Sequence, residues 1–252
     1  MPADVLTVGV GNVFYTPGEQ RATRVNDLFA AIARRYDLLN DLQSFGLHRR
    51  WKQQVAGLAA VQPGSRALDL CCGTGDIAFA LARRGAAVTG LDFSRQMLEV
   101  AEARNQIRDL KSKGRNPTFI QGDALQVPFP DGTFDAVTVG YGLRNLAGWE
   151  AGLAEMLRVA KPGGRVVVLD FGKPANVLWR KIYFRHLRCS VPLIGWLFCG
   201  NADAYAYILE SLNHYPAQLG VAEKMRELKL VNVRIFNLLG GAMAINYGEK
   251  PL

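Results

Sequence analysis

Cysteine and histidine are scarce in this sequence, and their spacing excludes a common kind of metal site. Only four cysteines and three histidines occur among the 252 residues. No two cysteines form a CxxC pair, which structural zinc sites usually contain. We therefore predict no metal ligands. The adjacent Cys71 and Cys72 are expected to be reduced and to pack as small apolar residues, as in a reducing compartment.

Long apolar runs are also missing. The longest, CSVPLIGWLFCG near residues 189–200, is too short to span a bilayer and contains Pro192. The first twenty residues lack a basic stretch followed by an apolar one, so we expect no secretory signal and a cytoplasmic location. Internal repeats and low-complexity tracts are absent as well.

Acidic residues are fewer than basic ones, 22 against 30, which gives a net charge of +8. An excess of this size suits an anionic membrane surface, nucleic acid or an acidic ligand, and equally suits a solvated basic surface. Hydrophobic residues make up 49% of the chain, so a sizeable core can be buried.

What the sequence does contain is a regular alternation of strand and helix patterns. Strands are predicted at 66–71, 86–91, 117–121, 133–139 and 164–170, and helices at 75–84, 94–110 and 148–160. Strands that alternate with helices of this length form βαβ units around a parallel sheet. Two further strands around Gly240 and Gly241 predict an antiparallel hairpin.

We interpret residues 1–252 as a single domain with an α/β fold. Residues 1–20 are read as a loose arm and 21–62 as a helical cap, where the spacing of Val25, Leu28, Phe29, Ile32 and Tyr36 is helical. The remaining parts are a core at 63–173, a helical insertion at 174–228 and a C-terminal hairpin at 229–252.

The stretch RALDLCCGTGDIAFAL, residues 66–81, predicts a strand, a glycine-rich turn and a helix. Gly73, Gly75 and Ala78 match G-x-G-x-x-G/A, a pattern that serves dinucleotides. S-adenosylmethionine requires glycines at such a turn for the same reason, because a side chain would block close approach of the backbone.

Three acidic residues at the ends of consecutive strands distinguish between a dinucleotide and S-adenosylmethionine as the ligand. Asp69 precedes the glycines, where its carboxylate would repel a pyrophosphate and attract the ammonium and sulfonium of S-adenosylmethionine. Asp92 is placed to accept hydrogen bonds from ribose hydroxyls, and Asp123 from the adenine amine, beside the N–H of Ala124. As a set these residues favour S-adenosylmethionine as the cofactor.

Residues 25–247 resemble the UbiE/MenG family of quinone C-methyltransferases. The segments that carry the resemblance are VNDLFAAIARRYDLLNDLQSFGLHRRWK, LDLCCGTGD, GDALQVPFPDGTFDAVTVGYGLRN and MLRVAKPGGRVVVLDFGKP. The resemblance implies a class I S-adenosylmethionine-dependent methyltransferase fold, which is Rossmann-like. It has a mostly parallel seven-stranded sheet with an antiparallel C-terminal strand. It also implies methylation of a ring carbon of a prenylated quinol.

The cofactor contacts of the family carry over onto Thr74, Asp92, Asp123 and Ala124. Gly140 departs from the pattern, because many bacterial members have a serine there, so we assign it no contact. With CCGTGD and LDFGKP, this variant most resembles the phototroph branch, which methylates 2-phytyl-1,4-naphthoquinone in phylloquinone synthesis. A final methylation in menaquinone synthesis is a related prediction, and a benzoquinol precursor of ubiquinone or plastoquinone is the alternative.

Methylation of a ring carbon needs a reduced, electron-rich ring and stabilisation of a developing aryloxide. Arg144 and Asn145 follow the fourth strand, and we predict that they hold and orient the aryloxide. Tyr141 is expected to line the ring pocket. His48 is a candidate general base, although an exposed histidine at a helix start is equally consistent. Tyr36 is a candidate for closing the cap over the cofactor, or else a core residue.

Other functions are less consistent with these residues. An N-methyltransferase would need an Asn/Asp-Pro-Pro-aromatic turn after the fourth strand, where this chain reads VGYGLRN. A nonenzymatic quinone-binding assembly subunit and an NAD-dependent oxidoreductase are further alternatives. We expect no nucleic-acid partner.

The prenylated substrate predicts peripheral contact with an anionic membrane, through a helix that carries Trp179, Ile182, Tyr183, Leu187 and Val191 on one side. A core position for that stripe is equally consistent. The oligomeric state stays open between a monomer and a homodimer.

Overall fold

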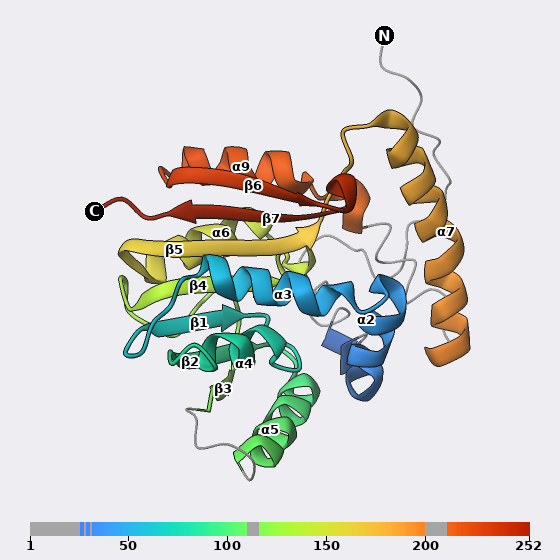
Figure 1. The fold of residues 1–252 in the computed structure, drawn as a ribbon. Helices are drawn as coiled ribbons and strands as arrows, with labels where there is room; N and C mark the ends of the chain where they lie inside the picture. The colour runs from blue at the N-terminus through green and yellow to red at the C-terminus, as the bar shows by residue number, and fades with distance from the viewer. Residues whose placement is uncertain (1–25, 28, 31, 110–115, 200–210) are drawn as a thin grey trace.

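The computed structural model describes residues 26–27, 29–30, 32–109, 116–199 and 211–252. The expected N-terminal arm, together with Val25 and Leu28 of the first predicted helix, lies outside the described residues. In the described part of the chain, seven strands form one sheet with helices on both faces (Figure 1).

The strands occur in the order β3-β2-β1-β4-β5-β7-β6 across the sheet. Their bounds are β1 (Arg66–Leu70), β2 (Ala87–Asp92), β3 (Thr118–Gln121), β4 (Phe134–Gly140), β5 (Ala160–Phe171), β6 (Val231–Leu238) and β7 (Met243–Glu249). β7 pairs antiparallel with both β5 and β6, whereas the pairs among β1 to β5 are parallel. The predicted parallel sheet and antiparallel hairpin are therefore confirmed.

The described helices are α2 (Tyr36–Ser44), α3 (Leu47–Leu58), α4 (Asp76–Ala82), α5 (Arg95–Asp109), α6 (Trp149–Val159), α7 (Val177–Cys199) and α9 (Ala217–Glu227), with short 3₁₀ turns η1 (Ala33–Arg35), η2 (Leu143–Asn145) and η3 (Leu239–Gly241). Three of them, α4, α5 and α6, begin and end within a few residues of the helices predicted at 75–84, 94–110 and 148–160.

The core forms two layers because successive strand side chains point to opposite faces of the sheet. In β1, Ala67 belongs to the layer beneath α3 and α4, and Leu68 to the layer beneath α6 and α9. In β5, Val167 and Val168 divide in the same way. Strands buried on both faces appear in the sequence as continuous apolar runs, as VVVL does here.

The strand order reverses between β1 and β4, since β2 and β3 lie on one side and β5 on the other. In open α/β sheets, ligands bind at this switch point, outside the carboxyl ends of the strands. Figure 1 shows that these strand ends face the part of the molecule where α2 and α7 lie.

The insertion predicted at 174–228 divides into two parts with different positions. α9 packs against β5, β6 and β7, so it is an ordinary crossover helix of the sheet. α7 contacts α2 instead and lies beyond the end of the sheet (Figure 1). None of the described helices, α7 included, is long and apolar enough to cross a membrane.

Candidate active site

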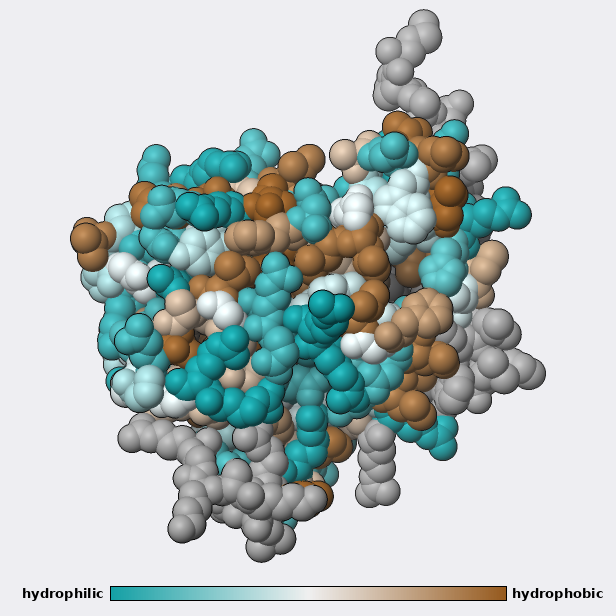
Figure 2. All heavy atoms as spheres, in the orientation of Figure 1, coloured by the Kyte–Doolittle hydropathy of each residue, from teal (hydrophilic) through white to brown (hydrophobic). Residues whose placement is uncertain are grey.

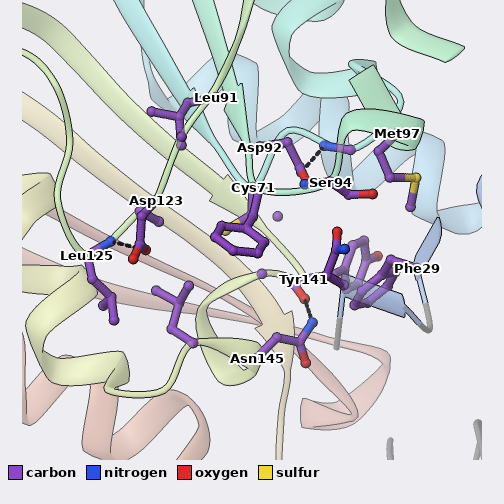
Figure 3. Close-up of a pocket in the computed structure, with 18 of the residues that line it drawn as sticks. Phe29, Cys71, Leu91, Asp92, Ser94, Met97, Asp123, Leu125, Tyr141 and Asn145 are labelled. Carbon is purple, nitrogen blue, oxygen red and sulfur yellow. Dashed lines mark hydrogen bonds between the residues drawn. The ribbon is translucent and has the colours of Figure 1, made fainter. Parts of the chain in front are cut away.

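A cavity of about 820 Å³, called the first cavity below, lies at the switch point. Its walls come from the ends of β2 and β4, from the loops that follow β1, β2, β3 and β4, and from the cap. Figure 3 shows Asp92, Asp123 and Tyr141 around it, with Phe29 and Met97 on one side. The sequence places these residues far apart, and the parallel strands bring their ends to one edge.

The two glycines of the turn have different roles. Gly73 lines the first cavity at φ +54°, and a Cβ built on it would have only Tyr36 within 4 Å, at 3.9 Å. A ligand can therefore approach the backbone there. Gly75, at φ +87°, lies outside the cavity wall, and a Cβ would come within 2.9 Å of Phe79 and Phe119. Gly75 is therefore required for packing of the turn.

Asp92 ends β2 and lies in the wall of the first cavity. Its Oδ2 accepts a hydrogen bond from the N–H of Gly73 at 2.7 Å, and Oδ1 accepts from the N–H of Ser94 at 2.9 Å. Each carboxylate oxygen has a second lone pair. Burial raises the pKa of Asp92, while these backbone hydrogen bonds act against the rise. The geometry fits the expected ribose contact.

Asp123 and Ala124 follow β3 and also line the first cavity. The N–H of Leu125 donates to Asp123 Oδ1 at 2.8 Å, which fixes the side chain at the cavity edge (Figure 3). Asp123 is exposed and Ala124 is 4% exposed. Their placement fits the expected contacts to adenine.

Asp69 is 1% exposed and does not line the first cavity. It accepts hydrogen bonds from the hydroxyl of Thr138 at 2.8 Å and from the N–H of Ala78 at 3.1 Å, so it joins β1 to β4 and to the start of α4. Burial raises the pKa of Asp69 to about 7.

Asp69 borders a small side chamber of about 300 Å³. This chamber shares part of its wall with the first cavity, namely Tyr36, Cys71, Gly73, Gly140 and Tyr141. Its wall also includes Lys52, which is 6% exposed and pairs with Asp76 at 2.8 Å. Lys52 is not among the predicted site residues. Its position on the buried face of α3, where a lysine is unusual, is the sequence signal that could have indicated it.

Thr74 is 2% exposed and belongs to the side chamber. Its hydroxyl donates to Asp37 Oδ1 of α2 at 2.8 Å. Arg104 of α5 donates to Asp37 Oδ2 at 3.0 Å, to the carbonyl of Thr74 at 2.8 Å and to Asp76 at 2.6 Å. Arg104 therefore fastens the helical cap onto the glycine turn, a role that helical periodicity does not reveal.

Tyr141 has a φ of +63°, which is costly for an aromatic residue. Its carbonyl accepts hydrogen bonds from Arg144 Nη1 at 2.7 Å and from Asn145 Nδ2 at 3.1 Å. Arg144 also pairs with Asp170 at 2.6 Å, and its guanidinium lies 4.6 Å from the centroid of the Phe171 ring. These contacts hold Tyr141 in its strained conformation.

Arg144 is 5% exposed and lies outside the walls of all the cavities described here, whereas Asn145 lines the first cavity. A guanidinium occupied by Asp170 and by the carbonyl of Tyr141 favours a positioning role for Arg144 over direct contact with an aryloxide. Gly140 also lines the first cavity, and a Cβ there would lie 2.5 Å from Ile77 Cδ1. A side chain at this position would therefore require the end of the Ile77 side chain to move.

A second cavity, of about 1160 Å³, lies between α2, α3, α7 and the start of β7. Its wall is largely apolar and includes Phe45, Trp51, Phe171, Trp179, Ile182, Tyr183, Leu187 and Met243. Tyr141 lines this cavity as well as the first, so it forms part of the wall of both. Figure 2 shows hydrophobic side chains along α7 and between α7 and α3.

His48 lines the second cavity and is 1% exposed, so the interpretation as an exposed histidine is wrong. Its Nε2 lies 2.8 Å from Asp41 Oδ1. Tyr36 lines the first cavity and the side chamber, which fits a cap residue over the cofactor. Burial raises the pKa of Tyr36.

Comparisons with known proteins agree with this geometry. The chain is 40% identical over 242 residues to the ubiquinone/menaquinone biosynthesis C-methyltransferase of Ectopseudomonas mendocina, covering 93% of this chain and 92% of that one. It is also 40% identical over 240 residues to the demethylmenaquinone methyltransferase of Desulfitobacterium hafniense, at 93% and 92% coverage.

Among solved structures, an S-adenosylmethionine-dependent methyltransferase from Aquifex aeolicus has the same fold. Its TM-score is 0.57 at 16% identity, and the match covers 87% of this chain and 97% of that one. The sequence profile of the ubiE/COQ5 methyltransferase family matches residues 18–250. The chain therefore belongs to the ubiE/COQ5 methyltransferase family and is an S-adenosylmethionine-dependent methyltransferase.

Proposed function

We propose that this enzyme methylates a ring carbon of a prenylated quinol, with a naphthoquinol as the substrate. The observation that carries the proposal is the position of Tyr141, which lines both the first and the second cavity. The first cavity has acidic residues suited to a cationic nucleoside, and the second has the apolar wall that a prenylated ring requires. Similar proteins named for ubiquinone and menaquinone biosynthesis support the substrate class.

The cofactor supplies its methyl group as an electrophile. The residues of the chain hold the two reactants. Asp92, Asp123 and Ala124 are proposed to hold the nucleoside, and Gly73 lets it approach the backbone. Lys52 and Asp69 border the side chamber and are proposed to receive the carboxylate and the ammonium of its amino-acid end, respectively.

Tyr141 is proposed to position the substrate ring next to the methyl group. A displacement of about 1 Å at a reacting centre lowers the rate on the order of 100-fold. A fixed conformation of Tyr141 would therefore help to maintain the rate. Arg144 and Asn145, which both donate to the Tyr141 carbonyl, would act through this side chain.

The branch of the family is a finer part of the proposal. CCGTGD, VGYGLRN and LDFGKP support the phylloquinone branch, with a menaquinone precursor as a second naphthoquinol substrate. A benzoquinol precursor is the competing substrate, because a largely apolar wall suits either ring.

A single competition experiment distinguishes these substrates. The enzyme receives labelled S-adenosylmethionine, a prenylated demethylnaphthoquinol and a prenylated benzoquinol precursor together, and mass spectrometry identifies the methylated product. We expect label in the naphthoquinol, and only after the quinone has been reduced. Equal rates with quinone and quinol would contradict the proposed chemistry, and label in the benzoquinol alone would replace the substrate.

Peripheral membrane binding by α7 is also part of this proposal. Arg180, Lys181, Arg185 and Arg188 are exposed on α7, close to the exposed Leu178 and Ile182. Trp179 and Ile182 line the second cavity and are exposed, and they lie next to Arg180 and Lys181 in the sequence of α7. Basic residues next to interfacial aromatic and aliphatic side chains suit an anionic lipid surface, which is where a prenylated quinol resides.

A further inference from the structure

His48 has one ring nitrogen that no described residue satisfies. Its Nε2 contacts Asp41 Oδ1 at 2.8 Å, whereas Nδ1 is buried and has no hydrogen-bond partner in the described part of the chain. A buried polar atom without a hydrogen-bond partner is costly, so such atoms usually have a ligand or a function. His48 lies in the wall of the second cavity, next to the space that a ligand would fill.

Asp41 determines which nitrogen is left for that ligand. A carboxylate only accepts hydrogen bonds, so Nε2 must carry the proton, and a neutral ring then has its lone pair on Nδ1. Arg49 holds Asp41 in place, since its Nε donates to Oδ1 at 2.7 Å and its Nη2 to Oδ2 at 2.5 Å.

The surroundings keep the His48 ring neutral near pH 7. Burial and the charge of Lys52 lower the pKa of His48, while Asp41 and Asp76 act in the opposite direction. The other titratable groups in the wall of the second cavity are Tyr141 and, on α7, Tyr183 and His186.

We propose that His48 is the general base that accepts the hydroxyl proton of the quinol through Nδ1, and that Asp41 is the positioning residue that fixes its tautomer. This inference rests on the proposed quinol substrate. It places a group that can accept a proton in the wall of the apolar cavity.

The proton and electron changes balance. The hydroxyl proton passes to Nδ1, the electron pair on oxygen moves into the ring, and the ring carbon bonds to the methyl carbon. The bond from that methyl carbon to sulfur breaks with its electron pair on sulfur. The ring carbon then loses its proton to water, and Nδ1 returns the first proton to the oxygen, which restores the aromatic quinol and the neutral histidine.

The tautomer can be tested on the free enzyme without any substrate. Nitrogen-15 NMR of the histidine rings distinguishes a protonated from an unprotonated nitrogen, and the chain has only three histidines, so His48→Gln assigns the signal. We expect an unprotonated Nδ1 and a protonated Nε2 at pH 7.5. In Asp41→Asn the amide can donate to Nε2, so we expect a proton on Nδ1. The reverse assignment in the parent would overturn the proposal.

Turnover tests the role in catalysis. The Gln amide of His48→Gln can still donate to Asp41, so the fold should hold, and loss of a general base typically lowers kcat by about 100- to 10,000-fold. We expect kcat to fall in His48→Gln and in Asp41→Asn, with KM for the quinol and cofactor affinity changed much less. In the parent, kcat/KM should decrease on the acidic side as His48 becomes protonated, and this limb should disappear in His48→Gln.

Arg49→Gln is the matched control, because Arg49 also bonds to Asp41 but does not touch His48. If Asp41 only fastened α2 to α3, Arg49→Gln and Asp41→Asn would reduce turnover equally, and the proposal would fail. It would also fail if His48→Gln raised only KM. Failure of the parent to methylate any quinol would instead reject the proposed function, while the NMR result would still report on the histidine pair.

Discussion

At the scale of single residues, the site depends on side chains that act through the backbone. Tyr141 keeps a positive φ because Arg144 and Asn145 both donate to its carbonyl. Asp92 likewise holds the glycine turn through the N–H of Gly73. Such contacts place the reactants, and their removal should alter binding and turnover in different proportions.

Asp92→Ala should weaken cofactor binding. A charged hydrogen bond contributes about 1.5–3 kcal/mol, so we expect the dissociation constant of S-adenosylmethionine to rise ten- to over a hundredfold. Isothermal titration measures this directly. Asp131→Ala is the control, because the side chain of Asp131 is 77% exposed and pairs with Arg158 away from the cavities. Equal affinity in the parent and in Asp92→Ala would place the ribose elsewhere.

Arg144→Lys should lower kcat more than it weakens cofactor binding. Lysine is a compact charge, and it cannot serve Asp170 and the Tyr141 carbonyl with the geometry of a guanidinium. A misplaced Tyr141 should reduce kcat at saturation by about tenfold or more. Arg158→Lys is the control, since Arg158 also joins a carboxylate to backbone carbonyls but lies outside the cavity walls. Normal turnover with reduced cofactor affinity would assign Arg144 to the cofactor site instead.

At the scale of elements, α2 and α7 are fixed to the enzyme in different ways. Asp37 of α2 bonds to Thr74 and Arg104, which fastens the cap to the glycine turn. α7 is held by the buried Tyr183 and Leu187, while Trp179 and Ile182 of the same predicted stripe are 38% and 50% exposed. The stripe is therefore partly core and partly surface, and the side chain of Val191 lies outside the described residues.

Neutralising the basic residues of α7 tests membrane binding. Each basic residue near an anionic bilayer contributes about 1 kcal/mol. Replacing Arg180, Lys181, Arg185 and Arg188 with Gln should therefore strongly weaken sedimentation with phosphatidylserine liposomes at low salt. Melting temperature and cofactor affinity should hardly change. A variant with Arg83, Arg84, Arg226 and Lys229 replaced loses the same charge elsewhere and should still sediment. If the α7 variant sediments like the parent, α7 is not the membrane contact.

At the scale of the whole molecule, the buried Asp69 should make stability depend on pH. Its pKa rises from 3.8 to about 7 on folding. The contribution of Asp69 to the free energy of unfolding is therefore fully present below pH 4 and is lost as the pH rises to 7. One unit of pKa corresponds to about 1.4 kcal/mol. Without cofactor, Asp69→Asn should therefore lose less stability than the parent between pH 5 and pH 7.5, as measured by urea unfolding.

The carboxyls with lowered pKa values, such as Asp41 and Asp76, do not obscure this comparison. Their stabilising effect is present above pH 4 and is lost only as the medium becomes more acidic. His48 is present in both the parent and Asp69→Asn, so its effect cancels when their free energies of unfolding are subtracted at each pH. Parallel stability curves for the parent and Asp69→Asn would mean that Asp69 is ionised in the folded enzyme.

The sequence by itself determined the alternation of strands and helices, the glycine turn and the acidic residues at the strand ends. These features follow from local periodicity and from turns that require the backbone conformations of glycine. Both depend only on residues that are close together in the sequence. Parallel strands end at one edge of a sheet, so Asp92, Asp123 and Tyr141 could be placed together from the strand pattern alone. The family resemblance rested on the same local segments.

Only the tertiary structure decided which partner each side chain meets. Arg144 follows the fourth strand as predicted, yet its guanidinium pairs with Asp170 of β5, 26 residues away in sequence. Arg104, Lys52 and Asp41 gain their roles from contacts between separate helices, and the second cavity exists because α7 lies beyond the sheet end. Such contacts depend on how elements pack, and periodicity within one element contains no information about its neighbours.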